Sequence, residues 1–213
     1  MSGNNNNGTI NGATWVAGKV GSGALSFDGA SNYVNMGFSS TLDFSQENAF
    51  TISAWVYPVG ENAGSMRSVF SRGGVNTGAA SRVYYISDMG NGWYAEINDG
   101  VNAVYNLKTV GRIQNVWQHM TLVWNGATLT LYKDASVIDS DTNTNFIGLW
   151  DGDDATDRNV NIGRDAKNGD NLWSGSIDEV RIYSRALSAQ EILDIYNDTG
   201  SAPPPSDTTD PSV

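Results

Sequence analysis

The feature that most limits the fold of this chain is a series of short segments in which apolar and polar residues alternate. The segments recur every ~10 residues between turn-forming residues, which is the pattern of an antiparallel sandwich. In FTISAWVYP at 50–58, alternation places Phe50, Ile52 and Val56 on one face of a strand. No ten-residue helical period precedes residue 187. The pattern therefore predicts an all-β protein.

The clearest local signal is a hairpin. Met120, Leu122 and Trp124 alternate up to the dipeptide Asn125-Gly126. This dipeptide adopts the positive φ angles of a two-residue turn, so we expect two antiparallel strands joined there. The dipeptide Lys133-Asp134 predicts a second turn, and another strand after it.

One helix is expected, at the C-terminal end. Ser188 is a predicted N-cap, and Glu191 three residues later completes a capping box. We predict a short helix around 189–197 that packs on the sandwich through Leu193 and Tyr196. Two antiparallel sheets with this single helix make a two-sheet jelly-roll sandwich.

The ends of the chain differ in composition from its centre. Residues 201–213 hold four of the five prolines, which predicts an extended linker to a further domain. Residues 1–9 are rich in glycine and asparagine and are expected to be a flexible lead-in. The folded domain is therefore predicted to occupy 10–200.

The charge and composition exclude two classes of partner. The net charge is −11, and the 12 Lys and Arg residues are scattered rather than gathered in the basic stripe that nucleic acids require. No run of ~18 apolar residues is present, so we predict no membrane insertion. Charged residues make up 16% of the chain, below the usual ~25%, which is typical of exported β-domains. We expect a secreted or cell-surface location of the bacterial type.

Five segments, taken in order, carry a family resemblance. They are GKVGSGALSFDGASNYVNMG, FTISAWVYP, VWQHMTLVWNGATLTLYKDASV, NIGRD and GSIDEVRIYSRALSAQEI. Together they resemble the laminin-G-like branch of the concanavalin A-like lectin/glucanase superfamily over roughly 8–198. The resemblance implies a jelly-roll, non-catalytic, exported module. Such modules are often attached to polysaccharide-degrading enzymes or adhesins and often carry a structural calcium ion.

The residues that the superfamily's enzymes use are missing from the sequence. The glycosidases resemble one another in a Glu-x-Asp-x-Glu strand, whereas Asp178 and Glu179 are adjacent here and would point to opposite faces of a strand. The lyases resemble one another in a Gln-x-His strand, whereas Gln118 and His119 are adjacent. We interpret His119 as a structural residue and expect that the chain is not an enzyme.

A calcium site is predicted from oxygen-bearing residues of the first and last strands. Asp28 and Asn32 lie in a glycine-containing turn, and the break in alternation near Asp178 predicts a β-bulge that re-aims its carboxylate. We predict that these three residues contribute to one calcium site, because calcium prefers carboxylate and carbonyl oxygens. In the alternative interpretation, Asp28 only caps its turn and Asp178 pairs with Arg181 or Arg185.

A second acidic stretch, DGDDATDR at 151–158, holds four aspartates. It lacks the ligand spacing of an EF-hand loop. The stretch is interpreted as a solvated loop, and the alternative is a calcium-dependent loop at the rim of the sandwich.

A sugar site is predicted from aromatic residues near turns. An exposed ring offers a flat apolar surface to the C–H face of a sugar, and we expect such rings at Trp93, Trp150, Trp173 and Tyr85. Nearby polar residues are predicted to bond the hydroxyl groups, namely Asp88, Asn91, Asn98 and Asp99. Arg72 or Arg82 would serve uronate or sulfate groups. The alternative for each ring is plain packing, as expected for Trp15 near a sheet edge.

These observations favour a non-catalytic carbohydrate-binding module that binds a polysaccharide or other glycan, with Ca²⁺ as a structural ion. The overall acidity favours a neutral glycan, or one bridged by calcium, over a polyanion. One alternative is an adhesion or protein-interaction module of a large surface protein. A glycanase or polysaccharide lyase is the third hypothesis.

Overall fold

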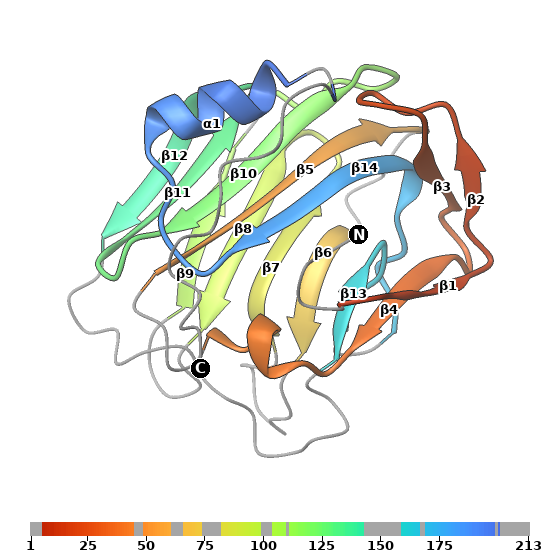
Figure 1. The fold of residues 1–213 in the computed structure, drawn as a ribbon, viewed down its shortest axis with the longest axis horizontal. Coiled ribbons are helices and arrows are strands. Elements are labelled where there is room, and N and C mark those ends of the chain that lie inside the picture. The colour runs from red at the N-terminus through yellow and green to blue at the C-terminus, as the bar shows by residue number, and fades with distance from the viewer. Residues whose placement is uncertain are drawn as a thin grey trace.

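The computed structural model describes residues 6–44, 49–60, 66–73, 82–98, 104–109, 111–142, 159–166, 169–198 and 200. Within them, the chain forms two antiparallel seven-stranded sheets and one short α-helix (Figure 1). The predicted jelly-roll sandwich is confirmed. The predicted linker at 201–213 lies outside these residues.

Sheet A contains, in spatial order, β1 (Thr9–Asn11), β4 (Tyr33–Gly37), β13 (Val160–Ile162), β6 (Arg67–Gly73), β7 (Arg82–Asp88), β8 (Trp93–Asn98) and β9 (Val104–Lys108). Sheet B contains β12 (Ser136–Thr142), β11 (Thr128–Lys133), β10 (Gln118–Trp124), β5 (Phe50–Pro58), β14 (Ser174–Tyr183), β3 (Ala24–Asp28) and β2 (Thr14–Val16). A 3₁₀ turn spans Ser40–Leu42, and α1 spans Ala189–Tyr196. No helix in the described part of the chain is long and apolar enough to cross a membrane.

The core lies between the inward faces of the two sheets. On β5, Phe50, Ile52 and Val56 are fully buried, as their alternation predicted. Tyr84 of sheet A meets Phe50 of sheet B with ring centroids 5.7 Å apart. Alternation along each strand therefore decides which side chains fill the space between the sheets.

The predicted hairpin is confirmed in register. Leu122 of β10 pairs with Leu131 of β11, and Gly126 in the turn has a φ of 91°. The second turn falls at Asp134 and Ala135, which have φ angles of 51° and 60°. It lies one residue later than predicted, because Lys133 is still paired with Met120.

The helix α1 covers part of the outer face of sheet B (Figure 1). Ser188 and Glu191 form the predicted capping box. The helix packs through Ile192 and Ile195, which belong to a small second core. The prediction that Leu193 packs on the sheet is wrong. One residue along a helix turns the side chain by about 100°, which points Leu193 toward solvent.

His119 lies beneath this helix. Its ring is 5.1 Å from that of Trp55 and 6.2 Å from that of Tyr196, so the three rings join β10, β5 and α1. Burial lowers the pKa of His119 to about 4, and the nearby charge of Arg181 adds to the shift. The structure therefore places His119, neutral, in the contact between helix and sheet.

We expect acid to weaken the fold through His119. The unfolded chain protonates this residue near pH 6.5, whereas the folded chain resists protonation until about pH 4. Stability is therefore full above pH 6.5 and falls by up to about 3 kcal/mol as the pH decreases toward 4. Urea unfolding at pH 7 and pH 4.5 measures the loss. His119→Gln should reduce the pH dependence, and equal losses in both proteins would contradict the assignment.

Candidate functional site

A pocket of about 600 Å³ opens beside the outermost strands β9 and β12. Pockets of this size hold small ligands. We call this one the rim pocket. Its lining residues come from the turn before β8, the end of β9 and the middle of β12: Met89, Asn91, Trp93, Lys108, Thr109, Ile138 and Asp139. Two of the predicted ligand residues, Asn91 and Trp93, therefore meet in one place.

The turn between β7 and β8 shapes this pocket. Gly90 has a φ of 89°, and its N–H donates to Oδ1 of Asp88 at 2.7 Å. The backbone oxygen of Asn91 accepts from Gly111 at 3.0 Å, and this fixes the tip of the turn. The Asn91 side chain is left exposed at the pocket mouth.

The opposite wall of the pocket is formed by β12, and a hydrogen bond ties this strand to β9 at the edge of sheet A. The N–H of Lys108 on β9 donates to Oδ2 of Asp139 on β12 at 3.1 Å. This bond holds the two sheet edges together and brings a cation and a carboxylate to one pocket. The rim pocket thus combines an apolar floor with a few polar groups, which suits a small polar ligand that has one apolar face.

The floor is formed in part by Trp93, which is fully buried. Its ring stacks on that of Trp173, with centroids 6.3 Å apart and an angle of 22° between the planes. The prediction that these two rings are exposed is wrong. Trp93 shares a strand face with Ala95 and Ile97, and that face points into the core.

Asp88 and Arg72 are also buried rather than available to a ligand. The carboxylate of Asp88 lies 2.6 Å from Nε of Arg112, and both side chains are almost wholly buried. Arg72 lies 3.1 Å from the carboxylate of Asp43 and is fully buried. Their charges are therefore paired inside the protein, because an unpaired charge is costly to bury. We therefore correct the prediction that Asp88 and Arg72 contact a sugar at the protein surface.

Tyr85 points away from the core, as one of two adjacent tyrosines must. It nevertheless has 0% exposure, so the prediction of an exposed ring is wrong. It meets Tyr94 edge to face at 6.1 Å, and the Tyr94 hydroxyl donates to Glu96 at 2.6 Å. Our sequence reasoning missed Glu96. The alternation in WYAEIN, which also places Asn98 on this face, was the available signal.

The Asp28 carboxylate organises its own turn. It accepts N–H groups from Ala30, Ser31 and Asn32 at 2.8–3.0 Å, and these hydrogen bonds lower its pKa. The amide oxygen of Asn32 accepts the N–H of Asp28 at 3.1 Å. The turn-capping interpretation therefore describes Asp28.

Asp178 lies at the predicted bulge, which is confirmed. The register against β5 shifts between Asp178 and Arg181, and Glu179 within the bulge has a φ of 48°. Oδ2 of Asp178 accepts the N–H groups of Lys19 and Val20 at 2.8 and 3.0 Å. The re-aimed carboxylate thus holds the loop between β2 and β3.

The two aspartates do not form one calcium site. Asp28 pairs with Ser174, so Asp178 lies four residues farther along β14, or about 13 Å away. Calcium ligands lie only about 2.5 Å from the ion. Among the described residues, no group of three or more acidic, histidine or cysteine side chains is placed to hold a metal ion.

Four predicted site features remain untested by these positions. Trp150, Asp99 and the acidic stretch 151–158 lie outside the described residues, and for Arg82 only the backbone is described. A calcium-dependent loop at 151–158 therefore remains the untested alternative to a solvated loop.

The two stacked sheets define the chain as a concanavalin A-like sandwich. The sequence profile of the concanavalin A-like lectin/glucanases superfamily matches residues 28–193, so the chain belongs to this superfamily. No curated protein matches it by sequence.

Solved structures with this fold include binding domains of toxins. The binding domain of Paraclostridial Mosquitocidal Protein 1 has 20% identity and a TM-score of 0.73, over 92% of this chain and 48% of that chain. The botulinum neurotoxin serotype G binding domain has 16% identity and a TM-score of 0.69, over 91% and 47%. The binding domain of botulinum neurotoxin DC, solved in complex with rat synaptotagmin II, has 12% identity and a TM-score of 0.65, over 91% and 47%. The chain spans about half the length of these domains, and the likeness shows the fold.

The role of Asp178 can be tested by removing its carboxylate. Asp178→Ala leaves the N–H groups of Lys19 and Val20 without their acceptor, so we expect a loss of about 2 to 4 kcal/mol in unfolding free energy. Chemical unfolding with EDTA and with added Ca²⁺ should give the same loss. Asp194→Ala, on the exposed face of α1, is the matched control. A loss seen only with Ca²⁺ would show that Asp178 acts through a metal.

Proposed function

We propose that this chain is a non-catalytic carbohydrate-binding module of an exported protein, and that its rim pocket receives one sugar unit of a polysaccharide. The observation that carries the proposal is the composition of that pocket. Met89 and Ile138, which are both half-buried, offer an apolar surface, whereas Asn91 and Asp139 offer hydrogen bonds at its edge. Sugars present both kinds of surface, because their C–H faces are apolar and their hydroxyl groups are polar.

The charges favour a neutral glycan. Among the described residues, the pocket lining contains one cation, Lys108, and one carboxylate, Asp139, on a chain whose net charge is −11. Arg72, which could have bound uronate or sulfate groups, is paired with Asp43 in the interior. A polyanion would therefore meet repulsion without a dedicated partner.

Several carboxylates are already bound to other groups of the protein, which supports a non-catalytic role. Asp28 and Asp178 accept backbone N–H groups, and Asp88 is paired with Arg112. Glu191 serves the helix cap. The similar toxin structures are named as binding domains, which agrees with a binding role. Export and a structural calcium ion belong to the same proposal.

A protein-interaction module is the second candidate. Val59, Ile113 and Val116 are each 40–49% exposed, and a hydrogen bond from Asn115 to Pro58 joins their two segments. Exposed apolar groups of this kind mark protein-binding surfaces. One similar toxin domain was solved in complex with a protein, which gives this alternative weight.

Affinity electrophoresis separates these candidates. We expect mixed-linkage β-glucan or galactomannan to retard the protein and polygalacturonate not to retard it. Asn91→Ala removes one hydrogen bond, which should weaken the apparent affinity about tenfold. Gln190→Ala on the exposed face of α1 should leave it unchanged. The experiment is repeated with EDTA to test the dependence on calcium.

Two results would contradict the proposal. Equal retardation of the wild type and Asn91→Ala would show that the rim pocket does not bind the polysaccharide. No retardation by any polysaccharide would refute sugar binding and favour the protein-interaction candidate.

A further inference from the structure

One tryptophan stands out by its exposure. Trp15 is 68% exposed, whereas Trp93 and Trp173 are wholly buried. An exposed ring is what sequence reasoning expected at the two buried positions, and the fold provides it at Trp15 instead. Such exposure of a large apolar ring is unusual, because burial of its surface would stabilise the fold.

The ring of Trp15 lies close to the backbone of the hairpin that carries it. Trp15 is the central residue of β2, the outermost strand of sheet B, and pairs with Leu25. A Cβ atom on Gly23 would lie 3.2 Å from Cε3 of this ring. Gly23 is not among the glycines with positive φ, so the backbone does not require glycine there. The absence of a side chain at Gly23 instead lets the ring lie close to the backbone.

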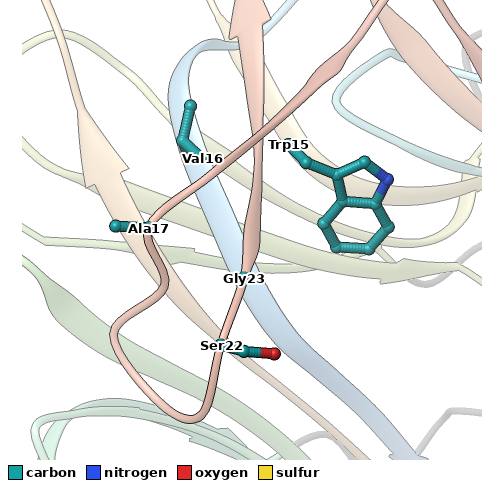
Figure 2. Close-up of a pocket in the computed structure, with 5 residues that line it drawn as sticks. All are labelled: Trp15, Val16, Ala17, Ser22 and Gly23. Carbon is teal, nitrogen blue, oxygen red and sulfur yellow. The ribbon is translucent and has the colours of Figure 1, made fainter.

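A hollow of about 500 Å³ accompanies the ring. Figure 2 shows the Trp15 ring and the Ser22 side chain projecting from the same side of the hairpin. Val16, Ala17 and Gly23 complete the lining, and none of the described lining residues has a charged side chain. On a chain with a net charge of −11, an uncharged hollow is complementary to a neutral ligand.

We propose that Trp15, Ser22 and Gly23 form a second sugar-binding site, which we call the edge site. The indole stacks on the apolar face of a neutral sugar ring, and the Ser22 hydroxyl bonds a sugar hydroxyl. The choice of ligand class rests on the proposed function. Because a tryptophan side chain has only two rotatable bonds, stacking costs little conformational entropy.

The two sites lie on opposite sides of the sandwich. Strands β2 and β12 are the two outermost strands of sheet B, so six strand spacings, or roughly 29 Å, separate them. A single sugar unit cannot occupy both sites. A long polysaccharide can engage both sites, or the module can join two chains, and either arrangement strengthens binding by effective concentration.

Stoichiometry tests the edge site directly. Calorimetric titration uses a trisaccharide released from whichever of β-glucan and galactomannan retards the wild type. We expect two trisaccharides per wild-type protein and one per Trp15→Ala protein. The affinity of Trp15→Ala for the whole polysaccharide should fall at least about tenfold, through loss of the second contact.

Further variants separate the ring from the fold. Trp15→Phe keeps an aromatic face and should stay within about threefold of the wild type, because the stacking surface is preserved. Gly23→Ala shifts the indole only slightly, so its affinity should fall less than that of Trp15→Ala. Leu193→Ala removes another exposed apolar side chain and should bind as the wild type does. Thermal unfolding of each variant checks that the fold is intact.

The outcomes distinguish the two proposals. If Trp15→Ala keeps two sugars and full affinity, the edge site is overturned while the rim pocket stands. If Trp15→Ala loses one sugar and Asn91→Ala loses nothing, the edge site stands and the rim pocket is overturned. Trp15-dependent self-association in sedimentation would assign the ring to a second copy of the chain and overturn the edge site.

Discussion

The inward faces of the two sheets pack against each other, and this packing governs where the other side chains lie. Each strand alternates its side chains, so filling the core fixes the direction of every remaining side chain. The core takes Tyr84 and Trp93 inward, which turns Tyr85 and Glu96 to the other face of sheet A. Large aromatic side chains fill the space between the sheets, and only aromatic side chains outside this space can contact a ligand.

The edges of the two sheets carry the candidate sites for the same reason. At one side, β9 and β12 meet, and the contact between Lys108 and Asp139 leaves the rim pocket beside them. At the other side, β2 ends sheet B, and Trp15 has no further strand to cover it. Edge strands expose groups that central strands bury, so a sandwich can bind ligands at its sides while its centre stays packed.

The hydrogen-bond register between strands explains why Asp28 and Asp178 have structural roles and do not share a calcium ion. Asp28 and Asp178 are both suitable calcium ligands by residue type, but the pairing of β3 with β14 sets them apart along the ladder. Asp28 instead accepts N–H groups of its own turn. Asp178 accepts those of the loop between β2 and β3, which it reaches because of the bulge at Glu179. Backbone N–H groups that would otherwise lack a partner are thereby satisfied.

Local sequence patterns predicted the all-β class, the hairpin at Asn125-Gly126, the capped helix after Ser188 and the bulge at Asp178. These features follow from local chemistry, since alternation, turn residues and caps act over a few neighbouring residues. The burial of Trp93 and the exposure of Trp15, by contrast, follow from how the strands are assembled into sheets. Exposure depends on which strands lie at the centre and which at the edge of a sheet. That order is set by contacts between segments far apart in the sequence, and local patterns do not contain it.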